Sequence, residues 1–424
     1  MASAPMSAAD YEAYRRDVFD FLWNEVEPRA SEIERHGAFP RESLFPKFAE
    51  HGLFGLLVPR EFGGIGLSAR QYLPFLAEFS KVSGVVRVLL HVHNTSARAV
   101  AHFGTDEQKA SLLPSIATGA SSMTFAITEP NSGTGLDVGA TATRDGDAWV
   151  LNGTKHYITN AAFADLHLVF CRTGSAGDRE GFTALVVPTD TPGFTIEEMP
   201  EMMGNNGPYH GVLRFENARA AIDSLVGAEG DGLNVFLGEL EPSRVFVAAS
   251  SLGTAERALE IALDFSKRRV TFGRAIAERP SVQSELAEMA RDIYALRLVL
   301  EDVADKLDRG EPCAIEASIA KLLGLETVMR VTDKALDVVG GRAYFADYPY
   351  PLERLYREAR INALEEGTPS IQRLVMARAL LKEDAPLSLA TLGTPYQPEG
   401  TDPALGKNPP QDLSYAGPLD DRTS

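Results

Sequence analysis

Two adjacent carboxylates near the end of the chain could perform acid–base chemistry. Glu365 and Glu366 follow an apolar, helix-like segment and are followed at once by Gly367, Thr368 and Pro369. Because glycine and proline end helices, this segment predicts a break between two helices. Burial among apolar neighbours at such a break would raise the pKa of a glutamate and suit it to proton transfer. A solvated helix end, where glutamate is common, explains these residues equally well, so the segment alone leaves both interpretations open.

The elements that would position this carboxylate form stretches of different periodicity. Apolar residues recur every three or four positions in residues 1–120 and 230–382, and they alternate in residues 121–229. We therefore predict an α+β fold with a helical N-terminal domain, a central small β-barrel or sandwich domain, and a C-terminal four-helix bundle. Residues 383–424 are rich in proline and glycine, which predicts a tail that is disordered or lies along a neighbouring subunit.

Particular segments support these assignments. In the C-terminal domain, long helices are expected at residues 254–268, 282–307, 314–339 and 364–381. In the central domain, the dipeptides Asp145-Gly146 and Asn152-Gly153 are typical of turns between paired strands. These dipeptides therefore predict hairpins.

Composition and charge argue against several classes of function. The 424 residues carry a net charge of −18 without a basic arm, which argues against a nucleic-acid partner. Cys171 and Cys313 are too few and too far apart for a disulfide framework or a zinc site, and no metal is expected. The chain shows no signal-peptide pattern and no run of about 18–20 apolar residues. We therefore expect a soluble, cytoplasmic protein without a membrane partner.

Five short motifs stand in a defined order along the chain. They are Thr128-Glu129-Pro130 with Ser132-Gly133, Asn152-Gly153-Thr154-Lys155 with Ile158-Thr159-Asn160, Arg269-Val270-Thr271-Phe272-Gly273, Gly340-Gly341 with Ala343-Tyr344, and Glu366-Gly367-Thr368. Each is weak alone, but five in this order are a strong signal. Together they resemble the motifs of the acyl-CoA dehydrogenase family, and the resemblance extends over nearly everything except the tail.

The resemblance implies FAD, bound between the central and C-terminal domains. At matching positions, the residues that it assigns to the cofactor are Ile127, Thr128, Thr134, Tyr157, Thr159, Arg269, Phe272, Gly341 and Thr368. Tyr157 would pack beside the isoalloxazine ring, and the Thr159 hydroxyl would reach the side of its reactive N5. Arg269 would come from a neighbouring subunit and neutralise the pyrophosphate. Gly341 would let the backbone approach that phosphate, and Thr368 would lie near the adenosine.

The resemblance also implies an activity, the α,β-dehydrogenation of an acyl-CoA thioester. Glu366 would remove the α-proton while hydride leaves the β-carbon for the flavin, and the Glu366 N–H with a ribityl hydroxyl would polarise the thioester carbonyl. Some relatives carry the base at the position of Ser243, but serine cannot serve as that base. The neighbouring Arg244 would shape the acyl site or make a salt bridge at a helix start. Glu365 replaces the usual tyrosine, and its charge would raise the pKa of Glu366 further.

Other positions depart from the family pattern. Tyr157 replaces a tryptophan, and Pro280, Asp337 and Ser370 replace polar residues that contact FAD. His210 stands where the family has a threonine. The remaining histidines, such as His91 and His93, are interpreted as structural or surface residues.

The expected assembly is a homotetramer, or a dimer, that passes electrons to a separate acceptor such as an electron-transfer flavoprotein. Three alternatives stay open at this point. The first is a dehydrogenase of acyl groups on a carrier protein, and the second is a flavin oxidase or oxygenase of the same fold. The third is a non-catalytic scaffold that has lost tight FAD binding.

Overall fold

The computed structural model describes residues 6–133, 137–174, 181–207, 210–346, 348 and 350–381. The predicted tail, residues 383–424, and the expected cofactor contact Thr134 lie outside this part of the chain. The chain divides into two compact units, residues 1–376 and 377–424. All described helices and strands belong to the first unit, except for the last residues of helix α11.

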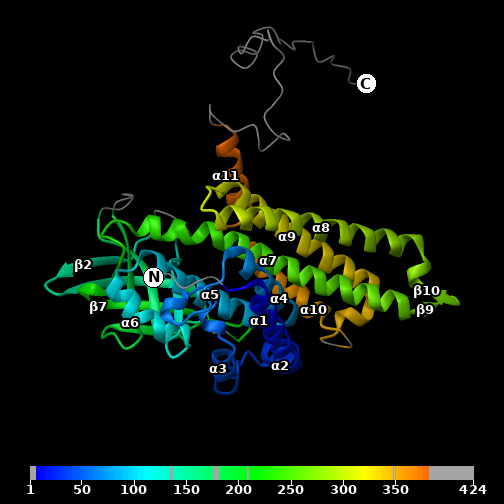
Figure 1. The fold of residues 1–424 in the computed structure, drawn as a ribbon, viewed down its shortest axis with the longest axis horizontal. Coiled ribbons are helices and arrows are strands. Elements are labelled where there is room, and N and C mark those ends of the chain that lie inside the picture. Colours follow the sequence, from blue (N-terminus) through cyan, green and yellow to red (C-terminus); the bar gives the residue numbers. More distant parts are fainter. Residues whose placement is uncertain are drawn as a thin grey trace, which may run out of the picture. The chain divides into compact units, whose positions relative to one another are not determined.

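Helices come first along the chain, strands follow in its middle part, and helices return at its end, in the order that the periodicity predicts (Figure 1). The α-helices are α1 (Ala8–Phe21), α2 (Glu27–His36), α3 (Arg41–Glu50), α4 (Ala69–Val82), α5 (Gly84–Phe103), α6 (Asp106–Ala117), α7 (Gly232–Arg268), α8 (Pro280–Asp308), α9 (Ala314–Val339), α10 (Leu352–Ala359) and α11 (Pro369–Leu380). The π-helix η1 (Leu22–Val26) joins α1 to α2, and the 3-10 helices are η2 (Leu53–Gly55), η3 (Arg60–Phe62), η4 (Ile222–Ser224), η5 (Ile276–Glu278), η6 (Gly340–Tyr344) and η7 (Arg360–Ala363). The strands are β1 (Met123–Ala126), β2 (Thr141–Asp145), β3 (Ala148–Ile158), β4 (Leu166–Arg172), β5 (Phe182–Pro188), β6 (Phe194–Glu198), β7 (Gly211–Ala221), β8 (Leu225–Val226), β9 (Val270–Thr271) and β10 (Arg274–Ala275).

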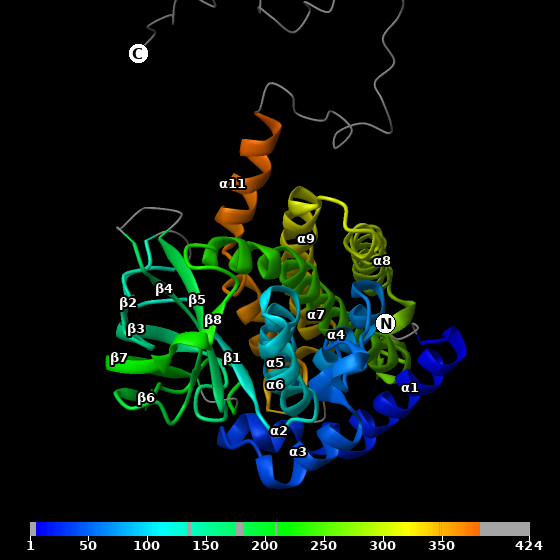
Figure 2. The same ribbon diagram turned by 60° about the vertical axis from the view of Figure 1, so that its left-hand side comes forward.

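Side-chain caps fix the starts of the two helices that lead towards the sheet. Ser68 and Gln71 form a capping box at the start of α4, so each side chain satisfies a backbone N–H that the helix leaves free. The Ser83 hydroxyl accepts from the Val86 N–H at the start of α5. α5 then packs on α4 and beside β1, as Figure 2 shows. Residues of α5 therefore lie between the helical region and the sheet.

The central domain is one sheet whose strand order is β6-β7-β3-β2-β4-β5-β8, with β1 paired to β4. Most neighbours are antiparallel, whereas β1 and β2 run parallel to β4. The turn predicted at Asp145-Gly146 joins β2 to β3, and Gly146 has a φ of 62° there. The sheet confirms the predicted central β-domain between two helical regions.

The hairpin predicted at Asn152-Gly153 is wrong. Both residues lie inside β3, at a bulge in its pairing with β7. A Cβ on Gly153, whose φ is 139°, would lie 2.6 Å from the Ala140 Cβ. The glycine is therefore required by a close backbone approach and a bulge rather than by a turn.

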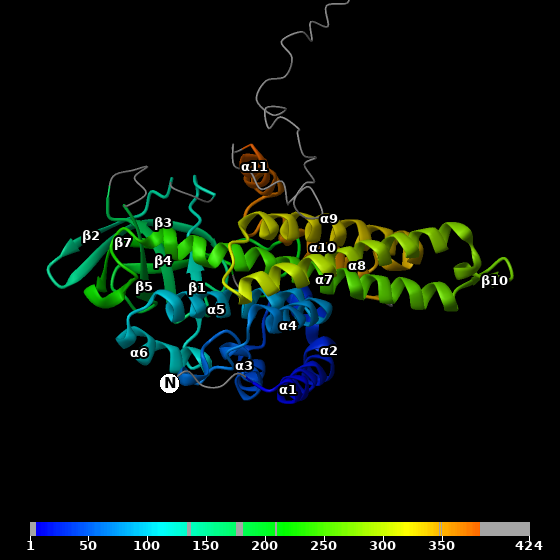
Figure 3. The ribbon, with the colours of Figure 1, turned by 45° about the horizontal axis from the view of Figure 1, so that its top comes forward.

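The C-terminal helices α7, α8 and α9 lie side by side, and α4 packs on the same bundle (Figure 3). α9 has the predicted bounds, residues 314–339, and α7 is longer than predicted because it continues through Pro242. The last helix was predicted from residue 364, which is wrong, because α11 begins at Pro369. Glu366 and Gly367 have positive φ values of 53° and 91°, which no right-handed helix contains.

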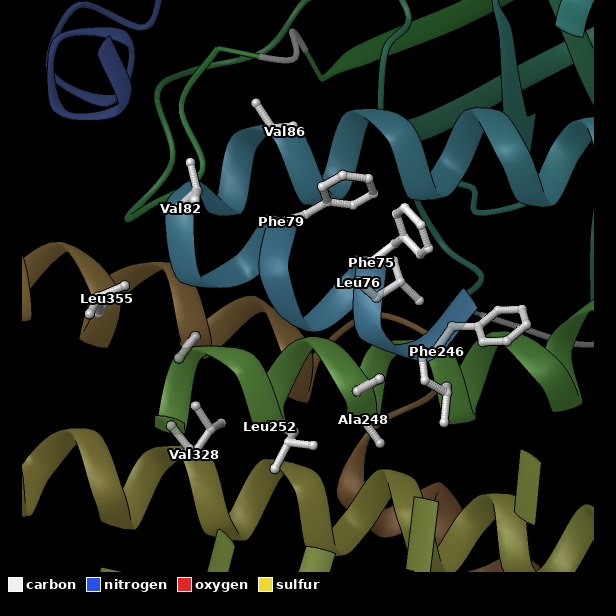
Figure 4. Packing of buried hydrophobic residues seen from close by; sticks show 14 of the residues in the cluster. Phe75, Leu76, Phe79, Val82, Val86, Phe246, Ala248, Leu252, Val328 and Leu355 are labelled. Atoms are coloured by element: carbon white, nitrogen blue, oxygen red, sulfur yellow. The ribbon is translucent and has the colours of Figure 1, made fainter. Parts of the chain in front are cut away.

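A continuous apolar core joins these helices. Phe75 and Phe79 of α4 and Phe246 of α7 belong to this core, and Figure 4 shows Leu252 of α7 and Val328 of α9 between those two helices. Burial of each such side chain contributes roughly 1.5–3 kcal/mol relative to exposure. α7 therefore sits at the centre of the bundle and is a rigid support for any residue that it presents.

Candidate active site

Few other features of the described residues compete with the acidic pair for a chemical role. Cys171 and Cys313 are buried free thiols. No group of three metal-ligating side chains occurs in the part of the chain that the structure covers. Within that part, no helix is long and apolar enough to cross a membrane.

Glu366 lies in a strained turn between η7 and α11. Its φ of 53° is left-handed, a conformation that costs a non-glycine residue roughly 1–2 kcal/mol. Two side chains hold the turn: Gln372 Nε2 and Arg244 Nε donate to the Glu366 carbonyl oxygen, at 3.0 and 3.4 Å. Among the described residues, none accepts from the Glu366 N–H. Such strain persists only where surrounding contacts impose it, so the solvated helix end does not describe this residue.

The Glu366 side chain is fixed by one short hydrogen bond. Ser243 Oγ donates to Glu366 Oε1 at 2.6 Å. Burial raises the pKa of the Glu366 carboxyl, although the hydrogen bond from Ser243 opposes the rise. A half-buried carboxylate with a raised pKa can accept a proton from a weak carbon acid.

Glu365 is held differently from its neighbour. Its two carboxylate oxygens lie 2.8 and 3.0 Å from the Arg87 guanidinium, whose side chain is 3% exposed. Burial alone would raise the pKa of Glu365, but the Arg87 charge and hydrogen bond hold that pKa below its usual value. As predicted, the Glu365 charge raises the pKa of Glu366, although it does so by less than burial does. Glu365 is therefore a paired anion and a poor base.

His91 belongs to this site, which sequence reasoning missed. Its Nε2 lies 3.0 Å from Ser243 Oγ, and burial lowers the pKa of the ring to about 4. Arg87 and His91 are four residues apart on α5, so they share one helix face. That spacing was a usable signal, but it does not show which helix the face meets. His93, on another face, is structural as expected, because it bonds Ile116 O and Met123 N.

Two more cations lie near the acidic pair. Arg244 is buried inside α7, where it also reaches Ser318 Oγ at 3.4 Å, so the expected salt bridge at a helix start is wrong. Lys321 of α9 donates to the Asn362 carbonyl, and burial lowers its pKa to about 8. The fields of both cations favour the charged form of Glu366, which limits the rise in its pKa.

A buried ion pair positions the segment expected to meet the flavin edge. Lys155 of β3 donates to Glu129 Oε1 at 2.7 Å and to the Ile127 carbonyl at 3.1 Å. The Thr128 carbonyl accepts from the His156 N–H at 2.7 Å. These bonds fix the segment against β3 and use its carbonyls, and the Thr128 hydroxyl donates to the Gly133 carbonyl at 3.3 Å. The N–H groups of Ile127 and Thr128, which have no acceptor among the described residues, are left for a ligand.

Tyr157 and Thr159 lie at the end of β3. Tyr157 has a φ of 59° and is 62% exposed, which leaves its ring open to a planar partner. The Thr159 hydroxyl lies 2.9 Å from His210 Nε2, and burial lowers the pKa of that histidine to about 4. His210 is therefore neutral near pH 7 and shares a proton with the hydroxyl expected at N5.

The remaining cofactor residues fall into two places. Arg269 and Gly341 line a cavity of about 360 Å³ together with Arg342, and Phe272 lies on the β9–β10 hairpin nearby. Figures 1 and 3 place this hairpin at the end of the bundle away from the sheet. A Cβ on Gly341 would meet no atom within 4 Å, so the backbone there is open to a ligand, and two guanidinium groups fit a diphosphate. One chain therefore does not bring these residues to Tyr157.

The predicted contact Thr368 and three positions that depart from the family pattern are exposed. Thr368 precedes α11 and accepts from the Gln372 N–H through its carbonyl oxygen. The three departing positions are Pro280, Asp337 and Ser370. The residues present fit FAD, since the exposed Tyr157 ring can stack on a planar group and the two guanidinium groups beside Gly341 can pair with a diphosphate.

Comparison with known proteins identifies the family. Models of the acyl-CoA dehydrogenase N-terminal, middle and C-terminal domains match residues 8–120, 124–218 and 230–381. An acyl-CoA dehydrogenase of Bacillus subtilis (strain 168) is 38% identical over 371 residues, which are 87% of this chain and 97% of the relative. Butyryl-CoA dehydrogenase from Megasphaera elsdenii superposes with a TM-score of 0.83 at 30% identity, covering 90% of this chain and 100% of that chain. The prolyl acyl carrier protein oxidase AnaB reaches a TM-score of 0.84 at 28% identity, covering 89% and 100%.

The matches confirm the predicted fold, cofactor and activity. They span both helical regions and the sheet, and the CoA-linked relatives favour acyl-CoA over the three alternatives. Members of the family are FAD flavoproteins. The chain therefore belongs to the acyl-CoA dehydrogenase family and is an FAD-dependent oxidoreductase that dehydrogenates acyl-CoA thioesters.

Proposed function

We propose that Glu366 is the base that removes the α-proton of the acyl thioester. The observation that supports this most is its held carboxylate: Ser243 fixes Oε1 at 2.6 Å, and burial raises the pKa of the group. In the step, the α-C–H bond breaks, an O–H bond forms on Glu366, and the electron pair stays on the substrate. Bound FAD supplies the two-electron acceptor for the hydride that leaves the β-carbon.

The thioester carbonyl needs a donor placed in advance, because its oxygen gains charge as the proton leaves. We assign this role to the Glu366 N–H, which has no acceptor among the described residues. With its left-handed φ of 53°, Glu366 would supply both the carboxylate that acts as the base and the N–H that acts as the donor. Arg244 and Gln372 then support the site by holding the carbonyl of that residue.

We assign FAD contacts to Ile127, Thr128, Tyr157, Thr159 and Thr368 in one subunit. Arg269, Phe272 and Gly341 would reach the FAD of another subunit in a homotetramer or a dimer. Their distance from the sheet supports this sharing, and so does the exposure of Phe272, whose side chain is 95% exposed in the single chain. An exposed aromatic ring of this size is typical of an interface.

The electrons must then leave the enzyme. We propose a separate protein acceptor, such as an electron-transfer flavoprotein, and a cytoplasmic location. The three predicted domain ranges, 1–120, 121–229 and 230–382, also remain part of this proposal.

Replacing Glu366 by Gln tests the role of the base. We expect E366Q to keep its flavin and to lose anaerobic bleaching near about 450 nm when saturated acyl-CoA thioesters are added. The parent and E365Q should bleach with the same panel. If E366Q reduces its flavin as fast as the parent, Glu366 is not the base.

A further inference from the structure

A line of polar side chains leads from Glu366 into the helical core. Ser243 of α7 bonds Glu366 Oε1 at 2.6 Å, and His91 Nε2 of α5 lies 3.0 Å from the same Ser243 oxygen. On the far side of the ring, His91 Nδ1 faces the Thr95 hydroxyl at 3.5 Å. His91 is 2% exposed, so both of its nitrogens depend on protein partners.

The chemistry of these groups fixes the direction of each hydrogen bond. An ionised carboxylate only accepts, so the single Ser243 proton must point at Glu366. The Ser243 oxygen is then an acceptor for His91, which must carry its proton on Nε2. A neutral ring has one N–H, so Nδ1 is left to accept from Thr95. Burial, which lowers the pKa of His91 to about 4, keeps the ring neutral near pH 7.

This order leaves the two oxygens of Glu366 unequal. Oε1 is occupied by the Ser243 hydroxyl, whereas none of the described residues donates to Oε2. We propose that His91 is a positioning residue, which orients the Ser243 hydroxyl so that Oε1 is held and Oε2 takes the α-proton. This inference rests on the proposed role of Glu366, and it adds His91 as a residue that orients Glu366 through Ser243.

Other charged groups also act on Glu366, and the test must separate them. Glu365, Lys321 of α9 and Arg244 of α7 act on Glu366 directly, whereas Arg87 of α5 acts on Glu365, and Glu365 in turn acts on His210. Arg87 also acts on His91, where its charge lowers the pKa of the ring. None of these residues changes in the variants below, so their fields stay nearly constant.

A merely structural role for His91 would have different consequences. A polar contact between α5 and α7 would change stability when lost, without moving the titration of Glu366. The hydrogen bond from Ser243 lowers the pKa of Glu366, so a positioning role predicts a rise in that pKa when the chain is broken. The pH profile of flavin reduction therefore distinguishes the two.

The experiment compares four variants of the FAD-loaded enzyme by anaerobic stopped-flow. S243A removes the donor, H91L removes both ring nitrogens, and H91Q keeps an N–H that can reach Ser243. S250A is the matched control, because Ser250 is a buried serine of α7 that donates only to its own helix at Phe246 O. For each, the limiting rate of flavin reduction and the substrate dissociation constant are measured across pH, with flavin content and melting temperature.

For S243A, we expect the acid limb to move up by about 1–2 pH units, the value of a hydrogen bond to a charged group. For H91L, we expect a limiting rate about 10- to 100-fold lower, because a misaimed base loses much of its advantage. Substrate affinity should change little in H91L, and H91Q should recover most of the rate. S250A should match the parent.

The inference is overturned if H91L matches S250A in rate and acid limb, whatever S243A does, or if H91Q is as impaired as H91L. If H91L loses its flavin, the limiting rates and acid limbs of S243A and H91Q still test the inference. Failure of the base assignment is seen separately, because E366Q would then reduce its flavin whatever His91 does.

Discussion

Removing Arg87 should destabilise the protein because it leaves a buried carboxylate without a partner. The Arg87 side chain is 3% exposed and that of Glu365 19% exposed, with nitrogen–oxygen distances of 2.8 and 3.0 Å. Arg87 also donates to Asn362 Oδ1 at 2.8 Å, so R87M opens two contacts at once. Breaking one side of a buried pair costs roughly 3–5 kcal/mol. Glu365 keeps some access to water, so we expect the lower end, about 3 kcal/mol.

This free energy converts into a modest shift in melting temperature. Unfolding entropy is about 2.1 cal/mol/K per residue, so the first unit, residues 1–376, unfolds with about 0.8 kcal/mol/K. A loss of about 3 kcal/mol then lowers Tm by about 4 °C. The melts need a fixed excess of FAD, because bound cofactor raises Tm by mass action.

Two further variants make the assay specific. R87M/E365L removes both charges and should recover most of the loss, because the double replacement leaves no unpaired charge. R214M breaks an exposed pair with Glu197 and should leave Tm nearly unchanged. The reasoning fails if R87M melts within about 1 °C of the parent, a loss below 1 kcal/mol. It also fails if the double variant melts no higher than R87M.

Two other residues give independent tests. R269A should weaken FAD binding by about 10- to 100-fold, as loss of a hydrogen bond to a charged group implies, whereas R274A on the same hairpin should not. Flavin absorbance per chain after gel filtration checks this, and equal retention by both variants would contradict the assignment. The folded pKa of Lys321, about 8, lies below the ordinary 10.5, so the unfolded chain binds more protons between these values. The contribution of Lys321 to stability therefore rises with pH across that window. Thermal melts should show a Tm that rises with pH in the parent and lacks this rise in K321M. If the slope of Tm against pH is the same in both, Lys321 does not titrate near 8.

Much of the fold followed from local pattern. The 3.6-residue period predicted α9 at its observed bounds, and alternation with Asp145-Gly146 predicted the first hairpin of the sheet. The Gly-Thr-Pro break located Glu366, although not its left-handed φ of 53°. The bulge at Gly153 could not be predicted, because the need for glycine there comes from Ala140, which directly precedes β2.

The missed site residues share one physical reason. His91 meets Ser243, and Arg87 meets Glu365, across 152 and 278 positions of the chain. Periodicity shows which residues share a helix face, but it does not show which other element that face meets. The partners depend on how α5, α7 and the last turn pack together, and a single sequence carries no local signal of that.

The central claim is that Glu366 removes the α-proton, and hydrogen exchange measures this step without the redox step. In D2O, the FAD-loaded enzyme is mixed with an acyl-CoA analogue that has no transferable β-hydrogen, and NMR follows loss of the α-proton signal. We expect the parent and E365Q to exchange this proton and E366Q, with flavin bound, to leave it in place. Exchange by E366Q at the parent rate, or its loss in E365Q alone, would contradict the account.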